Sequence, residues 1–283
     1  MTNLNTDFIY RMFHNRFWNV TNMKHKIPDS QIIKDLHFLF GISTFIKIYG
    51  LPRSGTNLMQ LLIEKNFRRT EVLMILGQKH ELIPKKISWT GKGWGWSAKE
   101  SKELFEKFST LQLNAVRRAY EKGEIKYLFC IKDPFAWIVS ISKFNHLNPS
   151  QLTKKQILNY MDEWNIKNEN YIDFFFENID RCFFVNYADL LNAKTTKNLI
   201  GHIGKKFALK PRTKMQYAVD AKLKDNVPWV KNYWSMLTRE KFDRTFYTKK
   251  KYLKLLDGKN IQIIKKKASK KVMEFLQSEH LKI

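Results

Sequence analysis

Residues 45–57 read FIKIYGLPRSGTN, an apolar run that leads into a loop with two glycines. Continuous apolar runs are typical of strands that are buried on both faces, as in parallel sheets. Gly50 and Gly55 let the backbone turn back and approach a ligand closely. Apolar positions with helical spacing follow the loop, and the first amides of a helix, together with its dipole, attract anions. This stretch therefore predicts a strand, an anion-binding loop and a helix, in that order.

Three further apolar runs are spaced along the chain, namely Val72–Leu76, Tyr127–Ile131 and Cys182–Val185. Helical patterns lie between these runs, and one of them extends from Thr153 to Phe176. Strands that alternate with helices predict βαβ units. We therefore expect a three-layer α/β fold in which helices flank a central, mainly parallel sheet. In such folds ligands bind at the carboxyl ends of the strands, so we expect the site in the loops that follow these runs.

The composition favours one folded domain, because 43% hydrophobic and 14% aromatic residues in a chain of 283 residues are enough for a large core. Within this single domain (residues 1–283) we expect three parts. They are an N-terminal helical extension over residues 1–40, an α/β core over residues 41–265 and a C-terminal helix over residues 266–283.

The formal net charge of +25 attracts phosphate-bearing ligands, nucleic acid or acidic polysaccharide. A coding bias toward lysine would produce the same excess, so the charge by itself supports anionic partners and nothing narrower.

The two cysteines, Cys130 and Cys182, each lie inside an apolar run, where a thiol behaves as a small core hydrophobe. The sequence has no CxxC or HExxH spacing of the kind that binds zinc. The N-terminal residues form no apolar segment of the signal-peptide type, and residues 36–51 are too short and too polar to span a bilayer. We expect a soluble protein without a transmembrane segment, in a reducing, cytoplasm-like compartment.

The loop after the first strand has the glycine spacing of a P-loop, GxxxxG, from Gly50 to Gly55, so the predicted fold is P-loop-like. Nucleoside triphosphatases continue this motif with Lys and Ser/Thr, which hold the phosphates and the magnesium ion. Here Thr56 and Asn57 stand at these two positions. Arg53 adds a permanent positive charge whose fork fits paired oxygens. The loop thus predicts a phosphate-type ligand without the usual metal–triphosphate chemistry.

A second candidate phosphate site follows the strand at residues 127–131. Asp133 before Pro134 predicts a helix N-cap with proline at the first helical position. This places Lys132 at the carboxyl end of the strand, and Ser140, eight positions later, within the following helix. A cation and a hydroxyl can then converge on one phosphate.

These two motifs resemble those of the PAPS-dependent sulfotransferases, which transfer a sulfuryl group from 3′-phosphoadenylyl sulfate (PAPS) and release PAP. The family's phosphosulfate loop has a Pro-(Lys/Arg)-Ser-Gly-Thr-(Thr/Asn) core, which is matched position by position by Pro52, Arg53, Ser54, Gly55, Thr56 and Asn57. The family also has an Arg-Asp-Pro segment with a Ser eight positions after the Arg, and this pair binds the 3′-phosphate. Lys132 and Ser140 keep that spacing, but lysine lacks the bidentate geometry of arginine. The resemblance implies PAPS as the cofactor, with no metal required.

A looser likeness lies near the C-terminus. Many family members have a Trp-Lys-Asn segment followed by a Thr-x-Glu-x-x-Phe helix, and residues 228–243 contain a similar pattern. In the family a basic, glycine-containing loop precedes this pattern and closes on the cofactor, whereas residues 222–226 contain no glycine. The resemblance implies that Lys222, Lys224 and Trp229 contact the cofactor.

Candidate catalytic residues follow the second strand, in the segment Gly77-Gln78-Lys79-His80-Glu81. His80 suits a general base because its unperturbed pKa lies near neutrality. Family members carry a Lys and a His before a proline, an arrangement that Lys79, His80 and Pro84 fit. Some members use a carboxylate instead, so Glu81 is the alternative base. By the same resemblance, Lys79 and Arg53 would stabilise charge on the bridging phosphate oxygen.

The acceptor is predicted only as a hydroxyl or amine, with a carbohydrate favoured. Trp89, Trp94 and Trp96 alternate with glycines in a short loop, and flat aromatic faces suit sugar stacking. A packed lid hinge or a surface turn explains the same loop. The lysine runs at residues 249–251 and 265–267 are either solvated faces or contacts for an anionic glycan.

Two other functions compete with this interpretation. A P-loop kinase-like phosphotransferase acting on a nucleotide or a sugar is disfavoured by the missing P-loop lysine. A non-catalytic, basic nucleic-acid-binding protein is suggested by the charge alone, because no recognition helix, zinc finger or RNA-binding aromatic motif supports it. We therefore expect no specific nucleic-acid partner.

Overall fold

The computed structural model describes residues 44–73, 75–85, 87, 89, 110–217 and 244–281. Four parallel strands form its central sheet, in the order β3-β1-β4-β5. Their bounds are Thr70–Leu73 for β3, Thr44–Gly50 for β1, Lys126–Ile131 for β4 and Cys182–Asn186 for β5. A separate two-stranded antiparallel sheet pairs β2 (Phe67–Arg68) with β6 (Lys210–Pro211). The predicted α/β architecture with a parallel sheet is confirmed.

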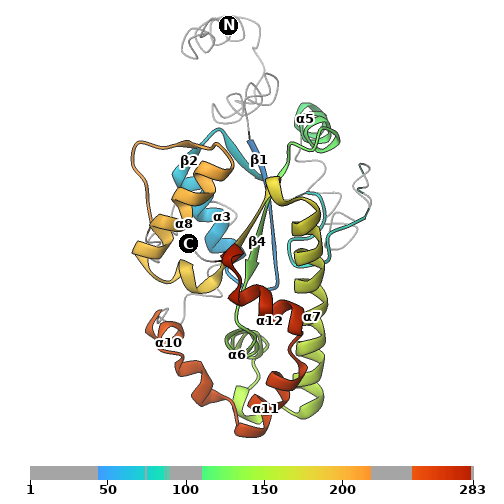
Figure 1. The fold of residues 1–283 in the computed structure, drawn as a ribbon, viewed down its shortest axis with the longest axis vertical. Helices are drawn as coiled ribbons and strands as arrows, with labels where there is room; N and C mark the ends of the chain where they lie inside the picture. The colour runs from blue at the N-terminus through green and yellow to red at the C-terminus, as the bar shows by residue number, and fades with distance from the viewer. Residues whose placement is uncertain are drawn as a thin grey trace, which may run out of the picture.

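Helices cover both faces of the sheet (Figure 1). Alternate residues of a strand point to opposite faces. Ile46 and Ile48 of β1 therefore pack with α3 (Thr56–Asn66) and α8 (Ala193–Lys206), in one apolar cluster. Phe45 and Tyr49 belong to the opposite cluster. That cluster includes residues of α5 (Thr110–Glu121), α6 (Pro134–Phe144), α7 (Lys154–Glu177), α11 (Gly258–Lys267) and α12 (Lys270–Gln277).

The helices begin where the sequence predicts. The Asp133 side chain accepts a hydrogen bond from the Ala136 amide at 3.0 Å, with Pro134 in the first helical turn of α6. Thr153 and Gln156 form a reciprocal capping box at the start of α7. The remaining described helices are α10 (Arg244–Thr248) and five short 3₁₀ turns, at Pro149–Gln151, Ile179–Arg181, Tyr187–Leu190, Lys251–Leu255 and Glu279–Leu281.

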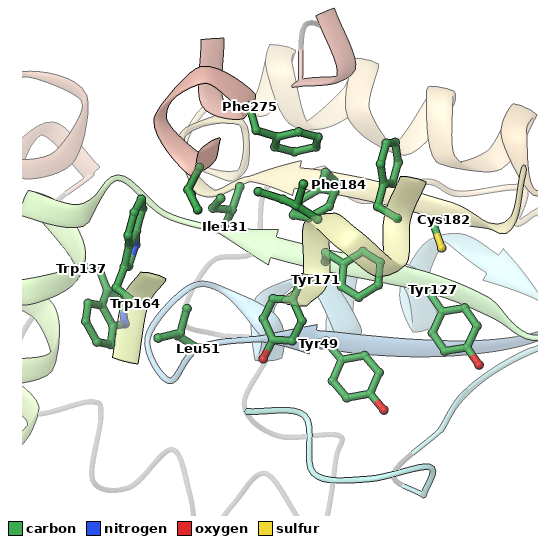
Figure 2. Close-up of a cluster of buried hydrophobic side chains, with 14 of the residues drawn as sticks. Tyr49, Leu51, Tyr127, Ile131, Trp137, Trp164, Tyr171, Cys182, Phe184 and Phe275 are labelled. Carbon is green, nitrogen blue, oxygen red and sulfur yellow. The ribbon is translucent and has the colours of Figure 1, made fainter. Parts of the chain in front are cut away.

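Two buried tryptophans connect the core to the loops at the carboxyl ends of β1 and β4. Trp137 of α6 donates its indole hydrogen to the Pro52 carbonyl at 2.8 Å. Trp164 of α7 donates to the Lys132 carbonyl at 3.0 Å. Figure 2 shows both indoles beside the ends of these strands. Because each indole is fully buried, moving either loop would break a buried hydrogen bond and expose apolar surface.

The strand order creates a switch point between β1 and β4. The chain passes from β1 to β3 on one side and then crosses to β4 on the other side. The loops after β1 and β4 therefore leave the sheet in different directions, and open α/β sheets bind their ligands in the crevice between such loops.

Three predicted segments either have other boundaries in the structure or lie outside the described residues. Of the apolar run at 72–76, the strand β3 includes Val72 and Leu73, and beyond the undescribed residue 74 the backbone of Leu76 and Gly77 is left-handed, with φ of 71° and 88°. The segment predicted as one C-terminal helix over 266–283 contains the end of α11, then α12 and a 3₁₀ turn. The N-terminal extension over 1–40 is outside the described residues. No helix in the described ranges is long and apolar enough to cross a membrane.

Gly55→Ala should lower the free energy of unfolding by more than about 1 kcal/mol. The added Cβ would lie 2.9 Å from the Tyr187 ring, on a backbone with φ of 98°. Gly201→Ala is the matched control, because a Cβ at this position of α8 meets nothing within 4 Å. It should raise stability by about 0.5–1 kcal/mol. Urea unfolding measures both variants, and equal effects would contradict the tight packing of the loop.

Candidate active site

The loop between β1 and α3 is a tight turn that leaves no room for side chains at its first glycine. A Cβ on Gly50 would lie 2.6 Å from both the Cys130 carbonyl oxygen and the Ser54 hydroxyl. The buried Ser54 closes the turn through its amide and its hydroxyl, which donate to the Leu51 carbonyl at 3.1 and 2.7 Å. Helix α3 then begins at Thr56, and the first amides of a helix have no intrahelical partner. These amides are available to an anion at the carboxyl end of β1.

Arg53 lies within this turn in a left-handed conformation with φ of 68°. Its guanidinium lies 5.4 Å from the centre of the Phe144 ring. Its Nε is buried, and no group in the described part of the chain accepts its hydrogen bond. A buried donor without an acceptor costs about 1–3 kcal/mol. An anionic ligand oxygen would remove this cost, so the arginine fits an anion site.

Lys132 and Ser140 converge next to the same turn. The Lys132 ammonium donates to the Ser140 hydroxyl at 2.7 Å and to the Arg53 carbonyl at 3.4 Å. Only 2% of Lys132 is exposed, and Ser140 is also buried. The loops after β1 and β4 thus share one cluster of hydrogen-bond donors at the switch point of the sheet.

Two tyrosines that sequence reasoning missed enclose this lysine. The centres of the Tyr187 and Tyr247 rings lie 3.9 and 4.2 Å from Lys132 Nζ, and the Tyr247 hydroxyl lies 2.9 Å from the Ser140 hydroxyl. Burial, followed by the nearby Arg53, lowers the pKa of Lys132 well below its usual value. Attraction to the ring faces offsets part of the cost of the buried charge. Tyr187 directly follows the strand β5, which is the signal that could have identified it.

The candidate base His80 is hydrogen-bonded to the phosphate loop. Its Nδ1 lies 2.6 Å from the Gly50 carbonyl oxygen. A carbonyl oxygen only accepts, so Nδ1 carries the proton and Nε2 keeps the lone pair of a base. Lys79 donates from its amine to Asn57 Oδ1, and its carbonyl accepts from the Gly50 amide at 2.9 Å. The segment after β3 is thereby fixed to the turn after β1.

Burial sets the charge of both residues. Burial, opposed by the bond to Gly50 and reinforced by the neighbouring lysines, lowers the pKa of His80 to about 4. Burial also lowers the pKa of Lys79 to about 8. At neutral pH the imidazole is therefore uncharged and able to accept a proton, while Lys79 is largely cationic.

The alternative base, Glu81, has a different environment. Its carboxylate is 55% exposed and lies 3.4 Å from the Lys167 ammonium of α7. Its backbone carbonyl accepts from the Tyr171 hydroxyl at 2.8 Å. His80 contacts the phosphate loop directly, and the Glu81 side chain pairs with α7 instead. This geometry favours His80 as the base.

Several predicted site residues fall outside the described residues. They are Lys222, Lys224, Trp229, Trp94 and Trp96. Trp89 is described, and it packs edge-on against Tyr120 with ring centres 5.7 Å apart. The lysine runs at 249–251 and 265–267 are exposed. Cys130 and Cys182 are free, buried thiols whose pKa burial raises to about 12.

The fold and the site define an α/β protein with a candidate anion-binding site at the switch point of its sheet. In sequence, no protein-family model and no curated protein matches this chain. Among solved structures it is similar to the sulfotransferase domain of the olefin synthase from Synechococcus PCC 7002. The two share 12% sequence identity with a TM-score of 0.38, over 87% of this chain and 97% of that domain.

His80 should stay neutral until the pH falls to about 4. Since an unfolded histidine titrates near ~6.5, the unfolded chain binds more protons between these two values. The stability that this group contributes is therefore present above about pH 6.5 and is lost as the pH falls through about 4. NMR titration of ¹⁵N-histidine-labelled protein, with His80→Gln to assign the signals, measures the midpoint and the tautomer. A midpoint near ~6.5 would contradict a buried imidazole bonded to Gly50.

Proposed function

We propose that this chain is a PAPS-dependent sulfotransferase, which transfers a sulfuryl group to a hydroxyl or amine and releases PAP. The observation that carries the proposal is the meeting of two candidate anion sites at adjacent strand ends. The Lys132 ammonium joins them, 2.7 Å from the Ser140 hydroxyl and 3.4 Å from the Arg53 carbonyl. A nucleotide with phosphates at both its 3′ and 5′ positions has one anion for each site.

The hydrogen-bond donors and cations of the two candidate sites fit a nucleotide that carries an anionic group at each end. The 5′-phosphosulfate end would be held by the first amides of α3, by Lys79 and by Arg53 Nε, which has no acceptor among the residues that the structure describes. Lys132 and Ser140 would hold the 3′-phosphate. Asn57 stands where a triphosphatase has its magnesium-binding Ser/Thr, and its side-chain oxygen accepts from Lys79. This arrangement supports an anion held by protein cations over one held through a metal.

The chain's own residues supply a base and charge stabilisation. PAPS, when bound, supplies an electrophilic sulfuryl group, and PAP is its leaving group. His80 Nε2 would take the proton of the acceptor hydroxyl, a role that typically contributes about 10²–10⁴-fold in rate. Lys79 and Arg53 would neutralise the charge that develops on the bridging phosphate oxygen. The hydrogen bond from Nδ1 to Gly50 would keep Nε2 unprotonated and correctly oriented.

For the acceptor, we propose a carbohydrate hydroxyl as the first choice. The support is the tryptophan–glycine loop at residues 89–96, whose flat rings suit a sugar face. Trp89 itself packs against Tyr120, so stacking would fall to Trp94 and Trp96. An anionic glycan would also be attracted by the exposed lysine runs.

PAP should bind with submicromolar affinity in magnesium-free buffer, and ATP and a random oligonucleotide should not compete. Ser140→Ala should weaken PAP about tenfold, because it removes a hydrogen bond to a charged group. Isothermal titration calorimetry measures these affinities.

Ser142→Ala is the matched control for this experiment. Ser142 lies on the same helix and is buried, but its hydroxyl donates to the Ile138 carbonyl at 2.6 Å within α6. The PAP affinity of the Ser142→Ala protein should equal that of the wild type. Preference for ATP over PAP would overturn the proposed function. Equal losses of PAP affinity in the two serine variants would show that Ser140 does not contact the ligand.

His80→Gln should retain PAP binding and lose transfer by about 10²–10⁴-fold. Glu81→Gln should retain both, because its carboxylate faces Lys167 and solvent. Release of PAP from PAPS, in the presence of a panel of simple sugars and phenols, measures turnover. The opposite pattern in the two variants would identify Glu81 as the base.

A further inference from the structure

A fully buried lysine lies in the middle of β1, one of the two inner strands of the sheet. Lys47 of β1 is 0% exposed, although lysine is rarely buried unless it is paired. Its ammonium donates to the Gly77 carbonyl at 2.7 Å, across thirty residues of sequence. It belongs to neither of the two anion sites described above. A charge in this position needs another explanation.

Tyr49 makes a parallel contact two residues along the same strand. Residues two apart in a strand lie on the same face of the sheet. The Tyr49 hydroxyl donates to the carbonyl of Leu76, which directly precedes Gly77. Two consecutive carbonyl oxygens of one turn are thus held by two donors from β1.

The turn that they hold needs such support. Leu76 and Gly77 both have left-handed backbones, with φ of 71° and 88°. This conformation is unfavourable for a leucine and persists only where its surroundings fix it. A Cβ on Gly77 would lie 3.0 Å from Pro84 and 3.3 Å from the Tyr49 hydroxyl, so the turn is also closely packed.

The same turn determines where the candidate catalytic residues lie. Strand β3 ends at Leu73, and the ladder of backbone bonds between β1 and β3 ends with the pair Lys47–Leu73. Beyond it, the side chains of Lys47 and Tyr49 hold residues 76 and 77. The Gly50 amide and carbonyl then bond to Lys79 and His80. One strand therefore fixes both the phosphate loop and the segment that carries the base.

We propose that Lys47 is a positioning residue, which, with Tyr49, clamps the Leu76–Gly77 turn and so fixes His80 against the phosphate loop. This inference rests on the function proposed above, because it names His80 as the base.

Lys47 also contributes to the charge environment of His80. Lys47 on β1, Lys79 on the same segment and Lys167 on α7 all oppose protonation of the imidazole. The carboxylate of Glu81 lies against Lys167, at 3.4 Å. Removing the charge at position 47 should therefore raise the pKa of His80.

The pKa of Lys47 itself is lowered to about 7, by burial and then by Lys79. A neutral amine retains hydrogen-bond donors, so the contact with Gly77 does not depend on the charge. Loss of the Lys47 proton above about pH 7 changes the field at His80 and leaves the clamp in place.

Lys47→Met tests the clamp, because methionine fills a similar volume and donates no hydrogen bond. The His80 titration midpoint, measured by NMR, should move upward from about 4. The turnover number should fall about 10- to 100-fold, because the base is no longer held in line. PAP affinity should stay within about twofold of the wild type, because the Lys132–Ser140 site is not part of the clamp.

Two further variants complete the experiment. Tyr49→Phe removes only the bond to Leu76, so it should raise the His80 titration midpoint by less than Lys47→Met does. This variant tests the clamp even if Lys47→Met does not fold. Tyr127→Phe is the control, since this tyrosine pairs with Lys47 across the β1–β4 ladder and its ring packs on Phe129 and Phe174. It should leave the His80 midpoint unchanged.

The outcomes separate the two proposals. Unchanged His80 signals in folded Lys47→Met and Tyr49→Phe proteins would overturn the clamp. If the wild type binds no PAP, the sulfotransferase proposal fails, but a shifted His80 midpoint in Tyr49→Phe, which removes a hydrogen bond and no charge, would still support a clamp on this segment.

Discussion

The parallel ladder between β1 and β4 is the constraint on which the rest of the site depends. It ends at the pair Gly50–Cys130, where the backbones approach so closely that a Cβ on Gly50 would lie 2.6 Å from the Cys130 carbonyl. Because these two strand ends touch, the loops that follow them lie side by side. Arg53 and Lys132 meet there for this reason, although 79 residues separate them in sequence. The switch in strand order makes this the point where an open α/β sheet binds its ligand.

The loops at this end of the sheet bring together cations that are costly to bury. Lys79 and Lys132 each have a pKa lowered mainly by burial, and Arg53 has a buried Nε without an acceptor among the described groups. Such a cluster destabilises the unliganded fold, since each charge loses hydration without full compensation. A bound polyanion would return part of that free energy by pairing with the cations. Structures hold strain of this kind mainly at functional sites.

Much of the fold could be predicted, because apolar runs buried on both faces leave a clear pattern in sequence. The error at the end of β3 has a physical cause. Ile75 and Leu76 are as apolar as strand residues, but they fill a buried turn that is held by side chains of another strand. Periodicity reports burial, and it cannot report which backbone conformation the buried residues adopt.

The site was predictable where its residues are tied to local structure, and not elsewhere. Lys132 and Ser140 meet because a strand end and a capped helix fix their eight-residue separation. Tyr247 arrives from α10, 107 residues beyond Ser140, and only the folded chain brings it there. Lys47 did leave a signal, since a lysine inside an otherwise apolar buried strand requires a partner. Its partner is a backbone carbonyl, which no side-chain pattern can identify.

The lysine at position 132 departs from the arginine of the family that the sequence resembles, and the structure gives a physical reason. Its ammonium lies between two tyrosine rings, with ring centres at 3.9 and 4.2 Å. A compact ammonium fits this space, whereas a planar guanidinium is wider and would have to displace a ring. The ammonium has three donors, and Ser140 and Arg53 take two of them. In the proposed function the third donor would bind the 3′-phosphate, so a point charge would take the place of the forked guanidinium of the family.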